Sequence, residues 1–374
     1  MQDLYYLYFS GLLIGSFFTT YFIIPRIINV VTYKRLMENP NHRSSHIKKV
    51  PSLGGIAFYI VIVLGIYFLE IWDKTNNSIS LIPGLLILFI IGLKDDLIVL
   101  SPFTKIGAEL LAIIFILQHP DFQILSLHGF LGIENIALYI SLPLSAFIML
   151  AIINAFNLID GIDGLASVVG IIIFGVIGAF FYVLHLYFFF GISLIMTGSL
   201  SAFLRFNISS KKKIFMGDTG SLIIGFVIAF QVIRLFAVPS FHLQQLPFLL
   251  ENLPLVVMAI LIVPIFDTAR VFTIRIINKK GPFSPDRNHI HHLLIDYLSL
   301  SHRRASFFIG VFNILFIAGV VFLATKITHL YLIGVLFFFI LCLIYFFYRI
   351  NLSFNNLRRK LWLQKKIKKF KTKA

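Results

Sequence analysis

The 374-residue chain has few charged residues and a single cysteine. Asp, Glu, Lys and Arg make up 13% of it, against about 25% in soluble domains, while 59% of the residues are hydrophobic. This composition excludes an ordinary soluble protein. Because Cys342 is alone and lies within an apolar run, a disulfide framework and a cysteine-based metal site are excluded. We find no internal repeat and no inverted pair of interrupted apolar segments, which argues against a transporter.

Long apolar runs account for most of the chain. A spanning helix needs roughly 20 predominantly apolar residues. The sequence predicts eleven such helices, at about 4–28, 54–72, 79–93, 106–118, 133–153, 165–182, 184–204, 219–238, 253–274, 306–325 and 329–348. The runs are continuous rather than alternating, which favours α-helices over a β-barrel. We therefore predict an all-α, polytopic integral membrane protein whose single transmembrane domain covers residues 1–348.

Positive charge is distributed unevenly. The net charge is +16, and 27 of the 32 Lys and Arg residues fall in the segments 31–53, 94–105, 205–218, 275–305 and 349–374. The positive-inside rule places these segments in the cytoplasm, with the N-terminus outside and the C-terminus inside. The basic tail, 349–374, is expected either to contact anionic lipids of the inner leaflet or only to set orientation. Nucleic acid is not expected as a partner.

Most acids on the cytoplasmic side of this topology lie in five short polar motifs. An ionisable side chain at membrane depth is costly and indicates a functional site. We therefore expect the five motifs to converge on one cleft that faces the cytoplasm, although the first pair of acids could also simply end a helix. The motifs are GLKDDL (Asp95, Asp96), NAFNLIDGIDGLA (Asn154, Asn157, Asp160, Asp163), FMGDTGSL (Asp218), PIFDTARVF (Asp267) and PFSPDRNHIHHLL (Asp286).

The motif at 154–166 contains two amides and two carboxylates within ten residues. Turn formation and helix capping by Asn and Asp would explain one of them but not all four. Asn154, Asn157, Asp160 and Asp163 are spaced by three, so a helix would place them along one gently drifting stripe. Amide and carboxylate oxygens suit a hard cation such as Mg²⁺, which is usually shared with substrate phosphates.

FMGDTGSL combines a lone acid with two glycines directly before an apolar run. Gly217 and Gly220 would allow a close backbone approach, and Asp218 is a candidate metal ligand. A helix cap formed by Asp218 is the alternative. Phe215 could stack on a nucleotide base or simply pack against apolar neighbours.

Histidines and cations supply groups that bind phosphate. Three histidines, His289, His291 and His292, follow Arg287 closely. They do not share one helical face and no cysteine supplements them, so phosphate binding fits better than zinc.

A basic loop precedes the second apolar run. Lys48 and Lys49 come just before a helix expected to begin at Gly54 and Gly55, an arrangement like a phosphate cradle. Basic loops next to membranes are also common for topological reasons. Carboxylates for Mg²⁺ and cations for phosphates together predict a phosphoryl-transfer site with one soluble anionic substrate and one lipid substrate.

In this combination and order, the motifs resemble the polyprenyl-phosphate N-acetylhexosamine-1-phosphate transferases over residues 40–294. This is the superfamily of the WecA, TagO and MraY enzymes. The resemblance implies that undecaprenyl phosphate attacks the β-phosphorus of a UDP-N-acetylhexosamine, which releases UMP, with Mg²⁺ required and Mn²⁺ as its substitute. It also implies a bacterial inner-membrane enzyme that begins a lipid-linked cell-envelope glycan from the cytoplasmic face.

The resemblance further implies roles for individual residues. Asp218 and Asn157 match the metal site, and Asp95 and Asp96 match an acidic pair, one of which acts as base or nucleophile. Because a phosphate monoester has a second pKa of about 6, a base has little to do, and we favour a direct single displacement. The motifs and the resemblance together give the expected substrate-binding set: Lys48, Lys49, Asn154, Asp160, Asp163, Phe215, Arg287, His289, His291 and His292.

Two departures favour the WecA and TagO branch. The chain has His-Ile-His-His where MraY enzymes have three consecutive histidines, and PSLGG where they have a TPTMGG-like stretch. Both favour a UDP-N-acetylhexosamine over UDP-MurNAc-pentapeptide, and the branch suggests GlcNAc as the sugar. The MraY reaction and a membrane transporter remain alternatives, and a homodimer is one option for the oligomeric state. The catalytic domain would use the cytoplasmic loops 31–53, 94–105, 154–165, 205–218 and 275–305.

Overall fold

The computed structural model describes residues 2–34, 36–38, 50–277, 279 and 300–349. In these ranges the regular secondary structure is helical apart from one short antiparallel pair, β1 (Met37–Glu38) and β2 (Val50–Pro51). The long helices are α1 (Gln2–Tyr33), α2 (Gly55–Leu69), α3 (Asn77–Leu97), α4 (Pro102–Leu117), α5 (Leu138–Ile159), α6 (Leu165–Val183), α7 (Tyr187–Asn207), α8 (Gly217–Ala237), α10 (Leu253–Ile260), α11 (Ile262–Ile277), α13 (His302–Ala324) and a final helix, His329–Arg349. Short elements connect them: η1 (Glu70–Trp72), η2 (Pro120–Phe122), η3 (Phe130–Gly132), α9 (Ser240–Leu243) and η4 (Leu250–Asn252).

Each predicted apolar segment forms a helix, but the predicted number of spans is not reproduced. Within the described ranges, nine helices are long and apolar enough to cross a membrane. A tenth span results if α10 and α11, which are bent by 69° at a break near Leu261, count as one. The segment predicted at 106–118 is α4, whose 16 residues fall short of the roughly 20 that a span needs.

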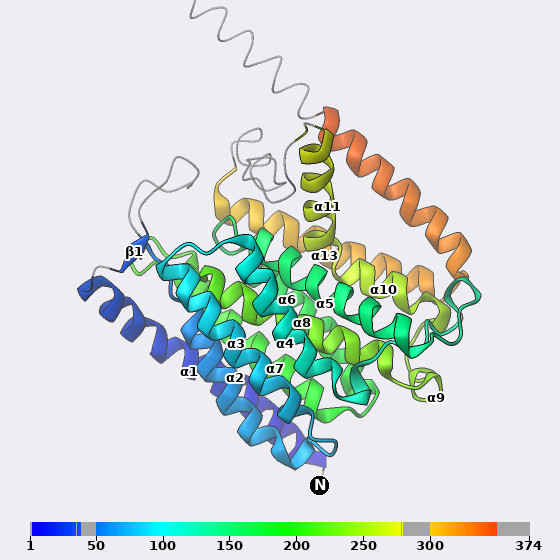
Figure 1. The fold of residues 1–374 in the computed structure, drawn as a ribbon, viewed down its shortest axis with the longest axis horizontal. Helices are drawn as coiled ribbons and strands as arrows, with labels where there is room; N and C mark the ends of the chain where they lie inside the picture. Colours follow the sequence, from blue (N-terminus) through cyan, green and yellow to red (C-terminus); the bar gives the residue numbers. More distant parts are fainter. Residues whose placement is uncertain (1, 35, 39–49, 278, 280–299, 350–374) are drawn as a thin grey trace, which may run out of the picture.

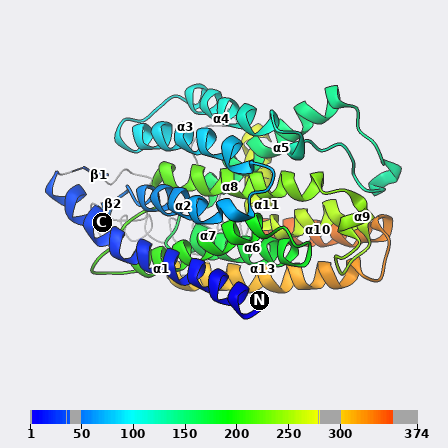
Figure 2. The ribbon, with the colours of Figure 1, turned by 90° about the horizontal axis from the view of Figure 1, so that it is seen from below.

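The helix α8 lies in the middle of the bundle (Figures 1 and 2). It packs against α2, α3, α5 and α6, while α1 lies at the periphery against α7. Nearly every residue of α8 from Thr219 to Phe236 is buried. A helix that is apolar on all sides is expected in such a central position.

Local sequence explains where two of the helices begin. The Ser101 hydroxyl accepts a hydrogen bond from the Thr104 amide at the start of α4, and Pro102 occupies the first helical position. At the start of α3, the Asp73 carboxylate accepts hydrogen bonds of 2.7 Å from the amides of Asn77 and Ser78. In contrast, α8 begins after Met216 without a side-chain cap from its own sequence.

The chain passes back and forth so that the polar motifs meet at one face of the bundle. The ends of α3, α5 and α7 and the starts of α2, α4, α6, α8 and α13 gather there, and we call this the site face (Figure 1). The loops that follow η1 and α13 lie at the opposite face (Figure 1), and their cations are Lys74 and Lys326. The assignment of the site face to the cytoplasm stays a prediction.

Candidate active site

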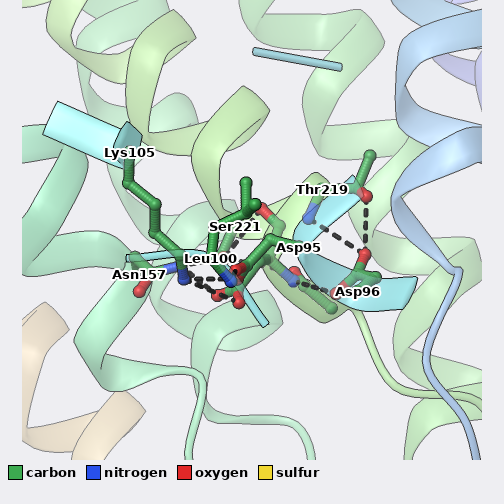
Figure 3. Close-up of polar contacts among 9 residues, drawn as sticks. Asp95, Asp96, Leu100, Lys105, Asn157, Thr219 and Ser221 are labelled. Carbon is green, nitrogen blue, oxygen red and sulfur yellow. Dashed lines mark hydrogen bonds and ion pairs between the residues drawn. The ribbon is translucent and has the colours of Figure 1, made fainter. Parts of the chain in front are cut away.

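Four helices contribute one polar cluster at the site face (Figure 3). Asp218 lies in the first turn of α8, and its Oδ2 is 3.0 Å from the Lys105 ammonium on α4. Lys105 also forms an ion pair with Asp95 at the end of α3. The Asn157 amide, in the last turn of α5, donates to Asp218 Oδ1 at 2.8 Å and to the Ser221 hydroxyl at 2.7 Å. Two carboxylates therefore share one cation, and an amide orients one of them.

The two acids of GLKDDL point in different directions. Asp95 accepts a hydrogen bond of 2.6 Å from the Leu100 amide and contacts Lys105, and its side chain is only 3% exposed. The Asp96 carboxylate instead accepts hydrogen bonds from the start of α8. Asp218 keeps 33% of its side chain exposed, so within the cluster it is open to a ligand whereas Asp95 is covered.

The predicted stripe of four polar residues is wrong. The helix α5 ends at Ile159, and the chain then turns through 160–164, where Gly164 has a φ of +83° and donates to Asn207. Asn154 and Asn157 lie on α5, Asp160 is the first residue after it, and Asp163 lies in the turn. Glycine favours this left-handed backbone, so Gly164 fits the point where the turn ends and α6 begins. The four polar residues are therefore divided between a helix and a turn.

Asp163 belongs to a second polar group beside the first. Its carboxylate is 2.5 Å from the Lys213 ammonium and 3.5 Å from His302, and its carbonyl accepts from the Ser306 hydroxyl. Lys213 also lies 5.3 Å from the centre of the half-buried Phe215 ring. The group therefore joins the turn before α6, the loop before α8 and the start of α13 around the aromatic side chain that was expected to stack on a base.

The interpretation of Gly54 and Gly55 as an open phosphate cradle is wrong. Their amides donate to the carbonyls of Phe215 and Met216 at 3.0 and 2.9 Å, and the Phe215 amide donates to Pro51. A Cβ on Gly55 would overlap the backbone of Gly220. The SLGG sequence thus holds the start of α2 against the start of α8, backbone to backbone, and these amides are already occupied.

Some predicted residues cannot be placed in the cluster. Asp267 is buried on α11 and lines an apolar cavity. The other predicted residues lie outside the described ranges: Lys48, Lys49, Asp286, Arg287, His289, His291 and His292. Of the five motifs, three converge within the part of the chain that the structure describes.

Two charged residues on α4 were missed from the sequence. Lys105 is central to the cluster, and Glu109, one helical turn deeper, accepts a hydrogen bond from the Asn154 amide and is 1% exposed. The signal was present, because both are ionisable residues four apart in an otherwise apolar segment. A lysine at the start of an apolar run looks, however, like an ordinary topological flank.

The cluster fits a divalent cation that takes its other ligands from substrate. Among the described residues, no three His, Cys, Asp or Glu side chains are grouped as a complete metal site. Mg²⁺ is commonly held by one or two carboxylates together with water and substrate phosphates, and Asp218 and Asp95 supply such a pair. Both carboxylates already contact the Lys105 ammonium, which shows that this position favours positive charge.

Comparison with known proteins adds a consistent set of relatives. Residues 78–236 match the model of glycosyl transferase family 4. The chain is 31% identical over 317 residues to the probable undecaprenyl-phosphate N-acetylglucosaminyl 1-phosphate transferase of Bacillus subtilis, with 81% of each chain covered. It is 29% identical to the decaprenyl-phosphate N-acetylglucosaminephosphotransferase of Mycolicibacterium smegmatis, covering 71% of this chain and 70% of the relative. It is 28% identical to the undecaprenyl-phosphate alpha-N-acetylglucosaminyl 1-phosphate transferase of Escherichia coli O157:H7, covering 70% and 69%.

Proposed function

Because the chain belongs to glycosyl transferase family 4, we propose that it transfers N-acetylglucosamine 1-phosphate from UDP-GlcNAc to a polyprenyl phosphate. The names of its relatives support this donor sugar and this type of acceptor. The observation that carries the proposal is the cluster of Asp218, Asp95, Lys105 and Asn157, in which carboxylates and a cation meet at one face of a membrane bundle.

In the proposed reaction, an oxygen of the lipid phosphate attacks the β-phosphorus of the UDP-sugar. The bond between the β-phosphorus and the bridging oxygen breaks, and UMP leaves with that oxygen. Mg²⁺ bound at Asp218 would neutralise the negative charge of the diphosphate, which is usually the main contribution to phosphoryl transfer. Asn157 orients the Asp218 carboxylate, and Lys105 is placed to bind a phosphate oxygen.

Asp95 has a supporting role in this mechanism. It holds Lys105 and can accept a proton from the lipid phosphate, but its burial and its bond with the Leu100 amide leave it poorly placed to attack phosphorus. These contacts support direct single displacement over a phosphorylated enzyme. Asp163, Lys213 and Phe215 form the proposed uridine end of the donor site, with Asp160 between the two groups along the chain.

An apolar cavity beside the cluster suits the lipid acceptor. It has a volume of about 190 Å³ and lies between the turn after α5, α11, α13 and the final helix. Ile159 and Leu165, which flank that turn, line it together with Phe266, Phe308 and Phe312. An isoprenoid chain needs an apolar lining of this kind. Because Ile159 and Leu165 flank the turn after α5, the cavity lies next to the polar cluster.

The remaining features of the proposal concern location and partners. The enzyme would lie in a bacterial inner membrane with the site face toward the cytoplasm, and its product would enter a cell-envelope glycan. The basic tail would contact anionic lipids, and a homodimer is compatible with the proposal. The charge asymmetry of the sequence supports the orientation.

The test is an assay on membranes that contain the protein. UDP-GlcNAc labelled in the sugar, undecaprenyl phosphate and Mg²⁺ should give labelled lipid and an equal amount of UMP. Asp218→Asn should abolish both products, whereas Glu70→Gln, at an exposed acid on the opposite face, should retain them. Transfer from UDP-MurNAc-pentapeptide alone would favour the MraY reaction, and no transfer from a panel of UDP-sugars by folded protein would overturn the proposal.

A further inference from the structure

We infer that Asp96 is a positioning residue that caps the start of α8 from the neighbouring helix and thereby fixes the direction of Asp218. This inference rests on the proposed function for its kinetic consequence. The sequence left open whether Asp95 or Asp96 acts as base or nucleophile, and this inference gives Asp96 a different role. The sequence pairs Asp96 with Asp95, but the structure gives the two carboxylates different partners.

The Asp96 carboxylate makes three hydrogen bonds with the first turn of α8 (Figure 3). Its Oδ1 accepts from the Asp218 amide at 2.7 Å, and its Oδ2 accepts from the Thr219 amide at 3.2 Å and the Thr219 hydroxyl at 2.5 Å. The first amides of a helix have no partner within the helix and need an acceptor from elsewhere. Both Asp96 oxygens are therefore used to hold the backbone of the proposed metal ligand.

The sequence at the start of α8 explains why the cap must come from another helix. A side-chain cap requires Ser, Thr, Asp or Asn before the first turn, but α8 follows Met216 and opens with Gly217, and no side chain of its own caps it. Gly217 has a φ of +72°. A carboxylate at a helix N-terminus also interacts favourably with the helix dipole, so Asp96 satisfies the amides and the charge preference together.

Glycines bring the two helices close enough for this contact. Gly92 lies one turn before Asp96 on α3, and a Cβ there would be 2.5 Å from the Thr219 Cα. A Cβ on Gly217 would be 2.6 and 2.7 Å from the two Asp96 oxygens. The carboxylate therefore occupies a closely fitted space between α3 and α8, which suits a structural cap better than a group that must reach a substrate.

The cap determines where the metal ligand points. The amide that Asp96 holds is that of Asp218 itself, whose carboxylate faces Lys105 on one side and Asn157 on the other. Release of this turn would let Asp218 move relative to both. Because small displacements in a phosphoryl-transfer site reduce the rate strongly, loss of the cap should reduce catalysis and weaken the use of Mg²⁺ without removing a reacting group.

The test compares Asp96→Asn, Asp96→Ala and Asp95→Asn in the full-length protein. Asparagine keeps an acceptor for the α8 amides, whereas alanine removes it. We expect Asp96→Ala to lose about 100-fold in kcat/KM and to need more Mg²⁺ for half-maximal activity. Asp96→Asn should recover much of this loss. Equal inactivation by both substitutions, with the Mg²⁺ requirement unchanged, would show that Asp96 takes part in the chemistry and would overturn the inference.

A second measurement does not depend on activity. Amide hydrogen exchange of the peptide that covers the start of α8 should rise in Asp96→Ala, rise less in Asp96→Asn and stay at the wild-type level in Asp95→Asn. Gly217→Ala, whose Cβ would overlap the Ser52 carbonyl as well as the Asp96 oxygens, should also raise exchange at this peptide. If the wild type transfers no sugar, the proposed function fails while this exchange pattern still tests the cap. Unchanged exchange in Asp96→Ala would refute the cap directly.

Discussion

Two helices of equal length occupy opposite surroundings in this protein. Both α8 and the final helix, His329–Arg349, have 21 residues and are apolar enough to cross a membrane. In the most apolar stretch of each, 89% of the residues of α8 are buried, against 11% of those of the final helix, although the final helix has the higher hydropathy. Hydropathy therefore does not decide which helix lies at the centre, because lipid solvates an apolar helix as well as another helix does.

The central helix differs by its small and polar residues. In α8, Gly220 and Gly225 allow backbones to approach closely, and Gln231 donates to Ser193 and to the Phe189 carbonyl on α7. Such residues are typical of helix interfaces in membranes. The final helix instead exposes large apolar side chains such as Phe337 and Phe338. The polar cluster is thus built at the end of the helix that its neighbours hold most firmly.

The largest effect is expected for the cation next to α8. Lys105→Met keeps the length of the side chain but removes the charge that Asp95 and Asp218 share. We expect kcat/KM to fall by about 10³-fold, as when a group that stabilises charge in the transition state is lost. The matched control is Lys94→Met, an exposed lysine at the end of α3 on the same face. Sugar transfer by both variants at saturating Mg²⁺ is the measurement, and equal activities would remove Lys105 from the site.

The next prediction compares the two helices directly by making the same type of substitution, Phe to Ala, once in each. Phe226 on α8 is fully buried and contacts the position of Gly84, whereas Phe337 on the final helix is 63% exposed. Phe226→Ala should leave a cavity and cost about 3 kcal/mol of stability. Phe337→Ala should change stability by less than about 0.5 kcal/mol. Thermal unfolding in one detergent gives both shifts, and similar values would contradict the distinction between the helices.

The sequence predicted the helices well because a membrane leaves few alternatives. Apolar runs of sufficient length must become helices in lipid, so each predicted segment is helical. The break between α10 and α11 was not predicted, although the sequence carries a signal for it: Pro264 lies four residues after Ile260 and cannot donate to the Ile260 carbonyl, so a helix kinks there. The sequence analysis also placed Asn157 and Asp218 in one predicted metal site. In the structure, the Asn157 amide nitrogen lies 2.8 Å from Asp218 Oδ1.

The details of the cluster depended on contacts that spacing does not contain. The helical spacing from Asn154 to Asp163 suggested a stripe, but α5 ends at Ile159 and Asp163 lies in the turn before α6. The role of Asp96 depends on the start of α8, more than 100 residues later in the chain. In the sequence, Lys105 looks like an ordinary cationic flank of an apolar run, and its role is apparent once α4 is placed beside Asp218 of α8. Periodicity reports on one helix, whereas this site is made from the ends of four.

A smaller effect is expected at the cavity beside the final helix. Ile309→Trp would fill part of the apolar cavity, because Ile309 lines it. We expect the KM for polyprenyl phosphate to rise by about tenfold, which corresponds to 1.4 kcal/mol, while the KM for UDP-GlcNAc stays the same. Val311→Trp places the same ring on an exposed face of α13 and serves as the control. A rise in the KM for UDP-GlcNAc instead would indicate that the cavity belongs to the donor site.

The smallest effect concerns the other end of α8, where the helix is capped by a second neighbour. His128, in the loop before α5, contacts the Phe236 carbonyl through Nε2 at 3.0 Å and the Ser240 hydroxyl through Nδ1 at 2.8 Å. Burial lowers the pKa of His128, although the Phe236 carbonyl and the charge of Glu134 oppose that shift. The imidazole is therefore neutral at pH 7, donating to the carbonyl and accepting from the hydroxyl.

This lowered pKa sets the sign of a pH effect on stability. Below about pH 6.5, the ordinary pKa of histidine, the unfolded chain binds a proton that the folded protein disfavours, so stability falls as the pH drops toward the lowered pKa. His128→Gln keeps a donor but does not titrate. Between pH 7.5 and 5.5, the melting temperature of the wild type should therefore fall further than that of the variant. The difference between these two falls should be smaller than the shift in melting temperature caused by Phe226→Ala. Parallel pH profiles would mean that His128 does not hold this end of α8, and that the helix depends on its neighbours for a cap only at the site face.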